Sequence, residues 1–261
     1  VNFGNITMLD GITKDGLLDV YSKVPMGNCA ELCAKEHNIT REDQDQFAVD
    51  SYTKAANAWK AGRFNNEIVA VAVPQRKGDP IMVSEDEEYK NVFLDKIPSL
   101  RPAFDKEGTI TAANASTLND GASALVLASE EAVAKFGLTP IAKIVSYADA
   151  AQAPEWFTTA PSLAIPKALA KVNMTVADVD FWELNEAFAS QCLYCRDALE
   201  IDNEKYNVLG GSISIGHPFG MTGSRTTGVV LRELARRKQK YGVVTMCIGG
   251  GQGAAGLFEV A

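Results

Sequence analysis

Apolar and polar residues follow two different periods along this chain, and the period changes from one segment to the next. Short apolar runs predict strands at residues 68–73, 125–127, 141–146, 179–183, 242–247 and 256–260. Apolar residues at helical spacing predict helices at residues 29–37, 41–61, 130–136, 162–172, 185–199 and 222–238. Because strands and helices alternate in the second half of the chain, the pattern favours a layered α/β fold.

Local signals mark the two ends of one predicted helix and the irregular stretch that follows it. Thr40 is a good N-cap, and Asp43 stands three residues later at the capping-box position. Gly62 can end the same helix. The long stretch of residues 62–120 fits poorly inside an α/β layer, so we expect it to be an insertion that covers a site.

Composition and charge exclude several classes of protein. The chain has 261 residues, of which 46% are hydrophobic and 22% charged, so it is long and apolar enough for one large domain or two smaller ones. A net charge of −8 argues against a nucleic-acid binder, which needs a basic face, but still allows an anionic small ligand. No apolar stretch approaches the roughly 20 residues that span a bilayer.

The cysteines and the first residue indicate the setting of the protein. Five cysteines are a sparse, odd set, which indicates reduced thiols in a reducing compartment. Two closely spaced pairs among them do not predict a metal site, because both pairs lie in helical patterns without the turn residues of a zinc knuckle. The chain begins at Val1 without the regions of a signal peptide, so we expect that residues upstream of Val1 are absent.

Asn185 begins the first of three segments that carry candidate chemistry. It follows a predicted strand and precedes a predicted helix, and ligands of α/β proteins gather at the ends of strands. Two interpretations stay open for its side chain. It can cap the helix, or its amide can hold a substrate carbonyl or a catalytic water.

His217 and Cys247 belong to the other two segments. His217 stands between Gly216 and Pro218, after glycines that let a ligand approach the backbone closely, and histidine is the commonest general acid or base. Cys247 ends an apolar strand and is followed by glycines whose N–H groups can point at an oxyanion. Beside such groups a thiol can act as a nucleophile or as an acid–base group, and a small buried side chain is the alternative. We expect His37, in a polar helix, at the surface.

Taken together, these segments resemble the thiolase family, whose pattern includes the sequence NEAF, the sequence GHP and a cysteine followed by glycines. In this chain they occupy residues 185–188, 216–218 and 247–251, in the family's order and at similar spacing. Further matches cover residues 26–27, 101–108 and 111–121. The first sixteen residues look closest to the mitochondrial acetoacetyl-CoA branch of the family, and the resemblance extends over essentially the whole chain.

The resemblance implies a thiolase-like layered α/β fold of two stacked halves with mixed five-stranded sheets and an inserted loop domain. By that template residues 1–118 are the CoA-binding loop domain, residues 119–140 end the N-terminal half, and residues 141–261 form the C-terminal half. Most of the N-terminal half is then absent. The resemblance also implies a homotetramer or dimer in the mitochondrial matrix, with the cytosol or the peroxisome as alternatives.

The family's reaction is a reversible Claisen condensation of two acetyl-CoA to acetoacetyl-CoA and CoA. The resemblance implies that Cys247 moves the proton of the acetyl methyl and that His217 assists the acyl-carrying thiolate and donates to the thioester oxygen. Asn185 is implied to hold a water that forms one oxyanion site with His217, and the N–H of Gly249 contributes to a second. We expect the amide, the imidazole and the thiol to meet at the floor of one narrow channel.

The family's acyl-carrying cysteine matches none of the five cysteines of this chain. That departure leaves a non-catalytic acyl-CoA-binding chain as one alternative. A longer-chain 3-ketoacyl-CoA thiolase of β-oxidation is the other, favoured by Gln252 and by the apolar residues Leu257 and Phe258.

The resemblance also implies binding residues for acetyl-CoA and for a cation. The CoA contacts are mostly small or apolar, as suits a pantetheine tunnel: Leu17, Met26, Ala103, Phe104, Ala112, Ser116, Ala187 and Phe188. Pro25 stands where many relatives have a histidine, so a polar contact to pantetheine is missing there. The mitochondrial branch binds potassium near CoA through backbone carbonyls and one tyrosine oxygen, and those positions are Tyr89, Ala112, Ala113, Ala115 and Ile213.

Overall fold

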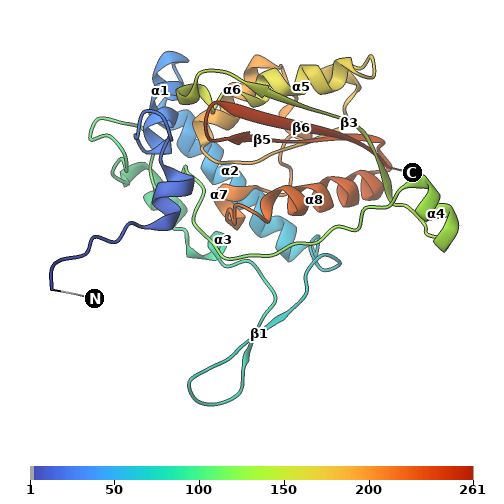
Figure 1. The fold of residues 1–261 in the computed structure, drawn as a ribbon, viewed down its shortest axis with the longest axis horizontal. Helices are drawn as coiled ribbons and strands as arrows, with labels where there is room; N and C mark the ends of the chain where they lie inside the picture. Colours follow the sequence, from blue (N-terminus) through green and yellow to red (C-terminus); the bar gives the residue numbers. More distant parts are fainter. Residues whose placement is uncertain (1–2, 261) are drawn as a thin grey trace.

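The computed structural model describes residues 3–260, and its centre is a mixed four-stranded sheet (Figure 1). The strands lie in the order β3-β6-β5-β4, with bounds Ala142–Ala151 (β3), Phe181–Leu184 (β4), Tyr241–Ile248 (β5) and Gln252–Val260 (β6). β4 is parallel to β5, whereas β6 is antiparallel to both β3 and β5. The predicted layered α/β fold is therefore confirmed.

Helices pack against both faces of this sheet. α5 and α6 lie on one face and α8 lies on the other (Figure 1). The helices are α1 (Met26–Glu36), α2 (Arg41–Lys60), α3 (Glu88–Asn91), α4 (Glu130–Phe136), α5 (Pro161–Ala170), α6 (Ala189–Ala198), α7 (Ser212–Ile215) and α8 (Thr222–Arg237). Within residues 3–260, none of them combines the length and the apolar character needed to cross a bilayer.

Strand β4 shows why the sheet needs a helix on each face. Trp182 and Leu184 point into the core shared with α5 and α6, whereas Phe181 points into the core shared with α8. Successive side chains of a strand alternate between the two faces, so a strand that is apolar on both is stable only when both faces are covered. All four residues of β4 are buried.

The local signals around α2 are confirmed. The Thr40 hydroxyl accepts from the backbone N–H of Asp43 at 3.1 Å, and the Asp43 carboxylate accepts from the backbone N–H of Thr40 at 3.2 Å. This capping box satisfies two N–H groups that have no partner inside the helix. The helix ends at Lys60, and Gly62 follows with a positive φ of 66°.

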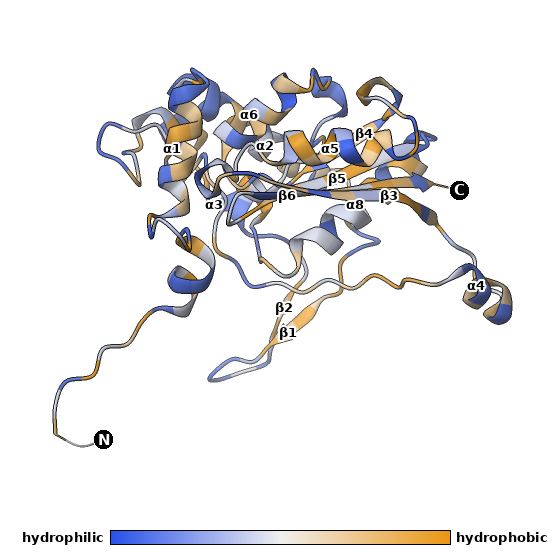
Figure 2. Ribbon diagram, turned by 45° about the horizontal axis from the view of Figure 1, so that its top comes forward, coloured by the Kyte–Doolittle hydropathy of each residue, from blue (hydrophilic) through white to orange (hydrophobic). Residues whose placement is uncertain are grey.

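A two-stranded hairpin projects from the layered body. It consists of β1 (Val71–Val73) and β2 (Ile81–Val83), which pair antiparallel around the turn-containing loop of residues 74–80 (Figure 2). The predicted strand at residues 68–73 is thus shorter than expected, and the pattern did not predict β2. The hairpin is apolar, yet Val71 is 60% exposed and Ile81 is 56% exposed.

Two predictions about local structure are wrong. Residues 125–127 do not form a buried strand: Val126 is 93% exposed, and no described strand pairs with this segment. The backbone N–H and C=O groups of a strand need hydrogen-bond partners on a neighbouring strand. An apolar sequence does not by itself provide such a neighbour. The helix predicted from residue 185 starts only at Ala189 with Phe188 as its N-cap, so Asn185 is not the helix cap.

Candidate active site

Asn185 lies directly after β4, at the edge where this strand runs beside β5. Its backbone N–H donates to the Thr245 carbonyl at 3.0 Å, which continues the parallel ladder by one residue. The side chain is only 3% exposed. Its amide oxygen accepts from the Ser212 hydroxyl, and its amide nitrogen lies 3.4 Å from Nε2 of His217. The backbone and both amide atoms therefore fix this side chain, and its N–H faces the imidazole.

His217 is held at both ring nitrogens. Its Nδ1 lies 2.7 Å from the Thr222 hydroxyl, and that hydroxyl donates its own proton to the Pro218 carbonyl at 3.0 Å. The Thr222 oxygen must then accept from Nδ1, so Nδ1 carries the proton and the lone pair of Nε2 faces the Asn185 amide. Burial lowers the pKa of His217 to about 4. The imidazole is therefore neutral at physiological pH, with Nε2 as an acceptor.

Cys247 lies near the end of β5, opposite Gly253 of β6. The thiol is half-buried and packs against the Phe188 cluster, which consists of Cys29, Ala30, Ile110, Ala115, Phe157, Ala187 and Phe188. Burial raises the pKa of Cys247 to about 12, so the group is a protonated thiol at neutral pH. The other four cysteines are buried.

The turn after Cys247 requires glycine at two positions. Gly250 and Gly251 have φ values of 81° and 79°, in the left-handed region that other residues adopt only with strain. A Cβ on Gly251 would also overlap the carbonyl of Gln152, whose N–H donates to the Gly251 carbonyl at 2.9 Å. The turn thus fixes the path of the backbone between Cys247 and β6.

The sheet brings two of the three predicted groups into contact and places the third at the same edge. Asn185 and His217 face one another. Leu184 pairs with Thr245, so Cys247 lies two residues beyond the last rung of the β4–β5 ladder. No hydrogen bond joins the Cys247 thiol to Asn185 or His217 among residues 3–260. The common edge of the sheet, rather than a direct contact, relates the thiol to the other two groups.

Most of the predicted CoA contacts gather around the Phe188 cluster. Met26 packs against it together with Cys247, and the ring of Phe104 lies 6.2 Å from the ring of Phe188. The backbone N–H of Ser116 donates to the Ala187 carbonyl at 3.0 Å. Leu17 ends a short helical turn, and its neighbour Gly16 lies beneath the ring of Phe219, which in turn faces His217. Ala103 and Ala112 are exposed beside these groups.

Comparison with known proteins decides the family. Residues 1–131 match the family described as Thiolase, N-terminal domain, and residues 138–260 match Thiolase, C-terminal domain. This chain belongs to the thiolase family. It is 49% identical to the probable acetyl-CoA acetyltransferase of Dictyostelium discoideum over 257 aligned residues. These residues make up 98% of this chain and 62% of that protein.

Two further relatives support the thiolase assignment. The mitochondrial acetyl-CoA acetyltransferase of Bos taurus is 47% identical over 258 residues, 98% of this chain and 61% of that protein. A thiolase of Ascaris suum, solved in complex with coenzyme A, superimposes with a TM-score of 0.92 at 42% identity, over 100% of this chain and 66% of that one. The chain therefore has the thiolase fold and spans less than two thirds of the length of the curated relatives it matches.

Two cavities lie near this candidate site. A cavity of about 10 Å³, room for one water, is lined by Glu183, Asn185, Ser212 and Thr222 among others. A larger cavity of about 900 Å³ lies between residues 118–125, α8 and the base of the hairpin, next to Pro218. Cys247 lines neither cavity, so the predicted narrow channel above the three groups stays a prediction.

Sequence reasoning missed several residues that shape the thiolase site. Ser212 and Thr222 orient Asn185 and His217, but a serine and a threonine in a glycine-rich stretch give no signal of such contacts. Two buried carboxyls were also missed. Glu186 accepts from Ser51 at 2.6 Å and from Asn207 at 3.0 Å. Glu183 has one oxygen without a hydrogen-bond partner among the described residues, and burial raises its pKa well above the ordinary value.

Proposed function

We propose that this chain carries the acid–base residues of an acetyl-CoA acetyltransferase. The reaction is the reversible Claisen condensation of two acetyl-CoA to acetoacetyl-CoA and CoA. One observation carries the proposal: the Asn185 amide faces the neutral imidazole of His217 at 3.4 Å, at the sheet edge where Cys247 ends the neighbouring strand. The names of the relatives in Dictyostelium and Bos taurus agree with this reaction.

Cys247 is the proposed acid–base group at the acetyl carbon. Its pKa of about 12 keeps the proton on sulfur at neutral pH. In the cleavage direction the thiol can therefore give this proton to the carbanion that leaves, and the resulting thiolate is a strong base. In the condensation direction the thiolate takes the methyl proton, and the backbone N–H of Gly249 donates to the oxygen on which charge develops.

His217 is the proposed partner of a second thiol. Its Nε2 begins as an acceptor, because Nδ1 donates to Thr222. A thiol that attacks an acyl group can transfer its proton to Nε2, and CoA that leaves as a thiolate can take that proton back. The imidazolium then donates to the thioester oxygen, together with a water held by Asn185. We expect an acyl-carrying thiol supplied from outside these residues, because none of the five cysteines matches the family's position.

Acyl-CoA is the proposed substrate, and residues 1–118 are the proposed CoA-binding part. Met26 and Cys247 pack against the Phe188 cluster, and the ring of Phe104 lies next to that of Phe188. Such apolar groups suit a pantetheine chain that carries its thioester toward the thiol. The Ascaris suum thiolase solved with coenzyme A supports this assignment.

A potassium site is proposed on the backbone around the same loop. The carbonyl oxygens of Ala112, Ala113, Ala115 and Ile213 accept no hydrogen bond within residues 3–260, although all but Ala112 are buried residues. Tyr89 lies on α3, which contacts α7, where Ile213 lies. Unpaired carbonyls and one phenol oxygen are ligands that a monovalent cation accepts. The cation would order the loop and supply no reacting group.

Assembly and location complete the proposal. The projecting hairpin exposes Val71, Ile81 and Met82, and burial against other copies of this chain in a homotetramer or dimer would remove them from water. Ile81→Lys is expected to lower the oligomeric state measured by light scattering, whereas Gln75→Lys in the hairpin loop leaves it unchanged. A mitochondrial location is proposed from the Bos taurus relative.

The proposed reaction is tested with the full-length protein that contains this chain. Cys247→Ala is expected to abolish acetoacetyl-CoA cleavage and acetyl-CoA condensation while CoA binding, measured by calorimetry, persists. Near-normal turnover of the variant would reject the role of Cys247. Wild-type protein that binds CoA without turnover would favour a non-catalytic chain, and much faster cleavage of long-chain 3-ketoacyl-CoA would favour the β-oxidation alternative.

A further inference from the structure

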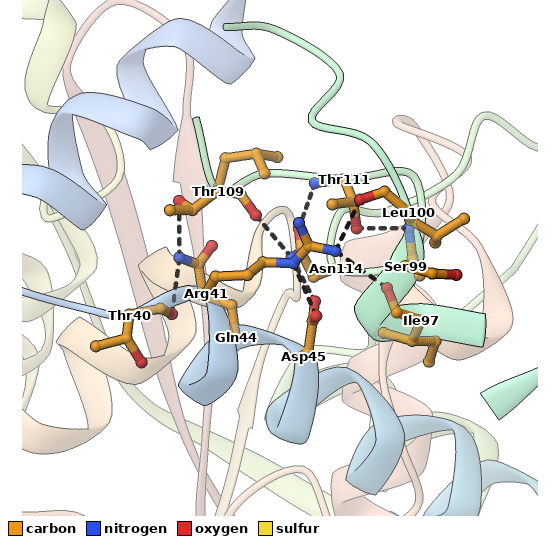
Figure 3. Close-up of polar contacts among 12 residues, drawn as sticks. Thr40, Arg41, Gln44, Asp45, Ile97, Ser99, Leu100, Thr109, Thr111 and Asn114 are labelled. Atoms are coloured by element: carbon orange, nitrogen blue, oxygen red, sulfur yellow. Dashed lines mark hydrogen bonds and ion pairs between the residues drawn. The ribbon is translucent and has the colours of Figure 1, made fainter. Parts of the chain in front are cut away.

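A partly buried ion pair on α2 holds the segment that leads to the proposed CoA loop (Figure 3). Nε of Arg41 donates to one oxygen of Asp45 at 2.7 Å. The same guanidinium donates through another nitrogen to the carbonyls of Ile97 and Leu100, both at 3.0 Å. Asp45 is only 7% exposed, so its charge needs these partners.

Asn114 is the second partner of Asp45, and every polar atom of its side chain is engaged. The residue is fully buried. Its amide nitrogen donates to the second oxygen of Asp45 and to the Thr109 carbonyl, both at 3.0 Å. Its amide oxygen accepts from the backbone N–H of Thr111 at 2.7 Å. The side chain thus closes the loop of residues 109–114 upon itself and joins it to α2.

The backbone beside Asn114 connects this loop to the segment that follows Asn185. The Asn114 carbonyl accepts from the N–H of Ala189 at 2.9 Å. Ala189 is the first residue of α6, whose N-cap Phe188 offers no side-chain cap, so Asn114 supplies a partner that the helix lacks. Two residues later the N–H of Ser116 donates to the Ala187 carbonyl at 3.0 Å.

Glu31 of α1 fixes the other end of the same loop. Its carboxylate accepts from the backbone N–H of Thr109 at 2.8 Å and from that of Ile110 at 2.8 Å. The loop is therefore held from two helices, and residues 112–116 have little freedom between these contacts. Ala112 and Ser116 are proposed CoA contacts, and residues 185–188 carry Asn185 and further CoA contacts.

We propose that Asn114, held by Asp45, is a positioning residue that fixes the CoA loop and the residue 185–188 segment relative to one another. The effect of this positioning on catalysis rests on the proposed function, since the loop matters to catalysis only when CoA binds there. Loss of the Asn114 side chain would leave Asp45 with an unpaired oxygen and would free the loop backbone that carries the two rungs to residues 187–189. Both the loop and the Asn185 segment would then loosen together.

Hydrogen exchange tests this coupling without any ligand. In the full-length protein, Asn114→Ala and Asn114→Asp are expected to speed amide exchange at residues 109–116 and, equally, at residues 185–189. Leu169→Ala, a core variant on α5, is the control for general loss of stability, and Gln46→Ala on the exposed face of α2 is the control for a silent change. Faster exchange confined to residues 109–116 would overturn the proposal, as would the same pattern in Leu169→Ala at equal loss of melting temperature.

Measurements of CoA binding and of steady-state kinetics test whether loss of the Asn114 side chain weakens CoA binding. A loosened loop must be ordered again when CoA binds, and ordering even one flexible side chain on binding can cost up to about tenfold in affinity. We therefore expect about tenfold higher Kd and KM for CoA in Asn114→Ala, with a smaller change in kcat, and wild-type values in Gln46→Ala.

A double-mutant cycle with Asp45→Asn is expected to be non-additive. Additive effects, or unchanged CoA affinity despite loosened segments, would overturn the positioning role. Wild-type protein that binds no CoA would reject the proposed function, whereas the exchange experiment still decides the coupling.

Discussion

The amide nitrogen of Asn185 lies 3.4 Å from Nε2 of His217, although 32 residues separate them in sequence. The Ser212 hydroxyl holds the amide oxygen of Asn185, and the Thr222 hydroxyl holds Nδ1 of His217. Four side chains therefore position this contact. The result is an imidazole whose acceptor nitrogen faces an amide donor. In the proposed reaction Nε2 accepts the transferred proton, while Thr222 keeps Nδ1 fixed.

Removal of either partner is expected to damage the proposed reaction strongly. Loss of one oxyanion donor typically lowers kcat by about 10²–10³-fold, so Asn185→Ala and His217→Asn are each expected to fall in that range. His37→Asn is the matched control, because His37 is exposed and was predicted so. Steady-state cleavage of acetoacetyl-CoA checks the expectation, and a less than fivefold loss in His217→Asn would contradict it.

The reactivity of Cys247 is expected to depend steeply on pH. Because its pKa is raised to about 12, the thiolate fraction grows about tenfold per pH unit between pH 6 and pH 9. Alkylation by iodoacetamide, followed site by site with mass spectrometry, should rise accordingly without a plateau. Cys29, Cys33, Cys192 and Cys195 are buried and serve as internal controls that remain unmodified. A plateau near pH 7 would show that the folded site holds a thiolate instead.

Glu183 is expected to make stability fall as pH rises. Burial raises the pKa of this carboxyl above its ordinary value of 4.5, so the folded state retains a proton that the unfolded chain has released. The contribution to the free energy of unfolding is complete below about pH 4.5 and is lost as the pH increases toward the folded pKa. Glu183→Gln removes this loss, so its melting temperature relative to wild type should increase from pH 5 to pH 8.

The control for this experiment is an exposed carboxyl. Glu107→Gln makes the same substitution in an exposed surface loop and serves as the control for a carboxyl that is not buried. A constant offset from wild type for Glu183→Gln would show that the buried carboxyl does not hold its proton.

Alanine substitutions at the two glycines of the turn after Cys247 are expected to separate the cost of backbone strain from the cost of steric overlap. Gly250 and Gly251 have similar positive φ values, but only Gly251 would bring a Cβ against backbone, including the Ala153 carbonyl at 2.7 Å. Gly250→Ala is expected to cost about 1 kcal/mol of unfolding free energy for the left-handed conformation. Gly251→Ala should cost about 1–3 kcal/mol more, because the backbone must move. Equal costs in urea denaturation would refute the overlap.

The parts of the fold that rest on local chemistry could be predicted from sequence. The capping box of Thr40 and Asp43 begins α2 because both groups lie within four residues of one another. The predicted helix at residues 130–136 coincides with α4, which Ser129 caps. Apolar runs also predicted β3, β4, β5 and β6, with errors of a few residues at their ends.

What depends on distant partners could not be predicted in this way. The apolar residues 125–127 gave the pattern of a buried strand, but burial and pairing depend on neighbours that the pattern does not specify. The burial of Glu183 could not be predicted either, since a carboxyl normally indicates surface and this one lies inside the protein. Asn185, His217 and Cys247 could be proposed as site residues because each stands at the end of a predicted element or beside glycine. Ser212 and Thr222 were not, because their contacts exist only after the chain has folded.

The parallel pairing of Leu184 with Thr245 has a consequence for how this site can change during evolution. Asn185 follows β4 and Cys247 lies on the adjacent strand β5. Their spacing is therefore set by the β-ladder, which rises about 3.3 Å per residue. Side-chain replacement does not alter that spacing. In the proposed reaction, new acyl preferences would then have to arise from the walls that other segments contribute, while Asn185 and Cys247 keep their spacing.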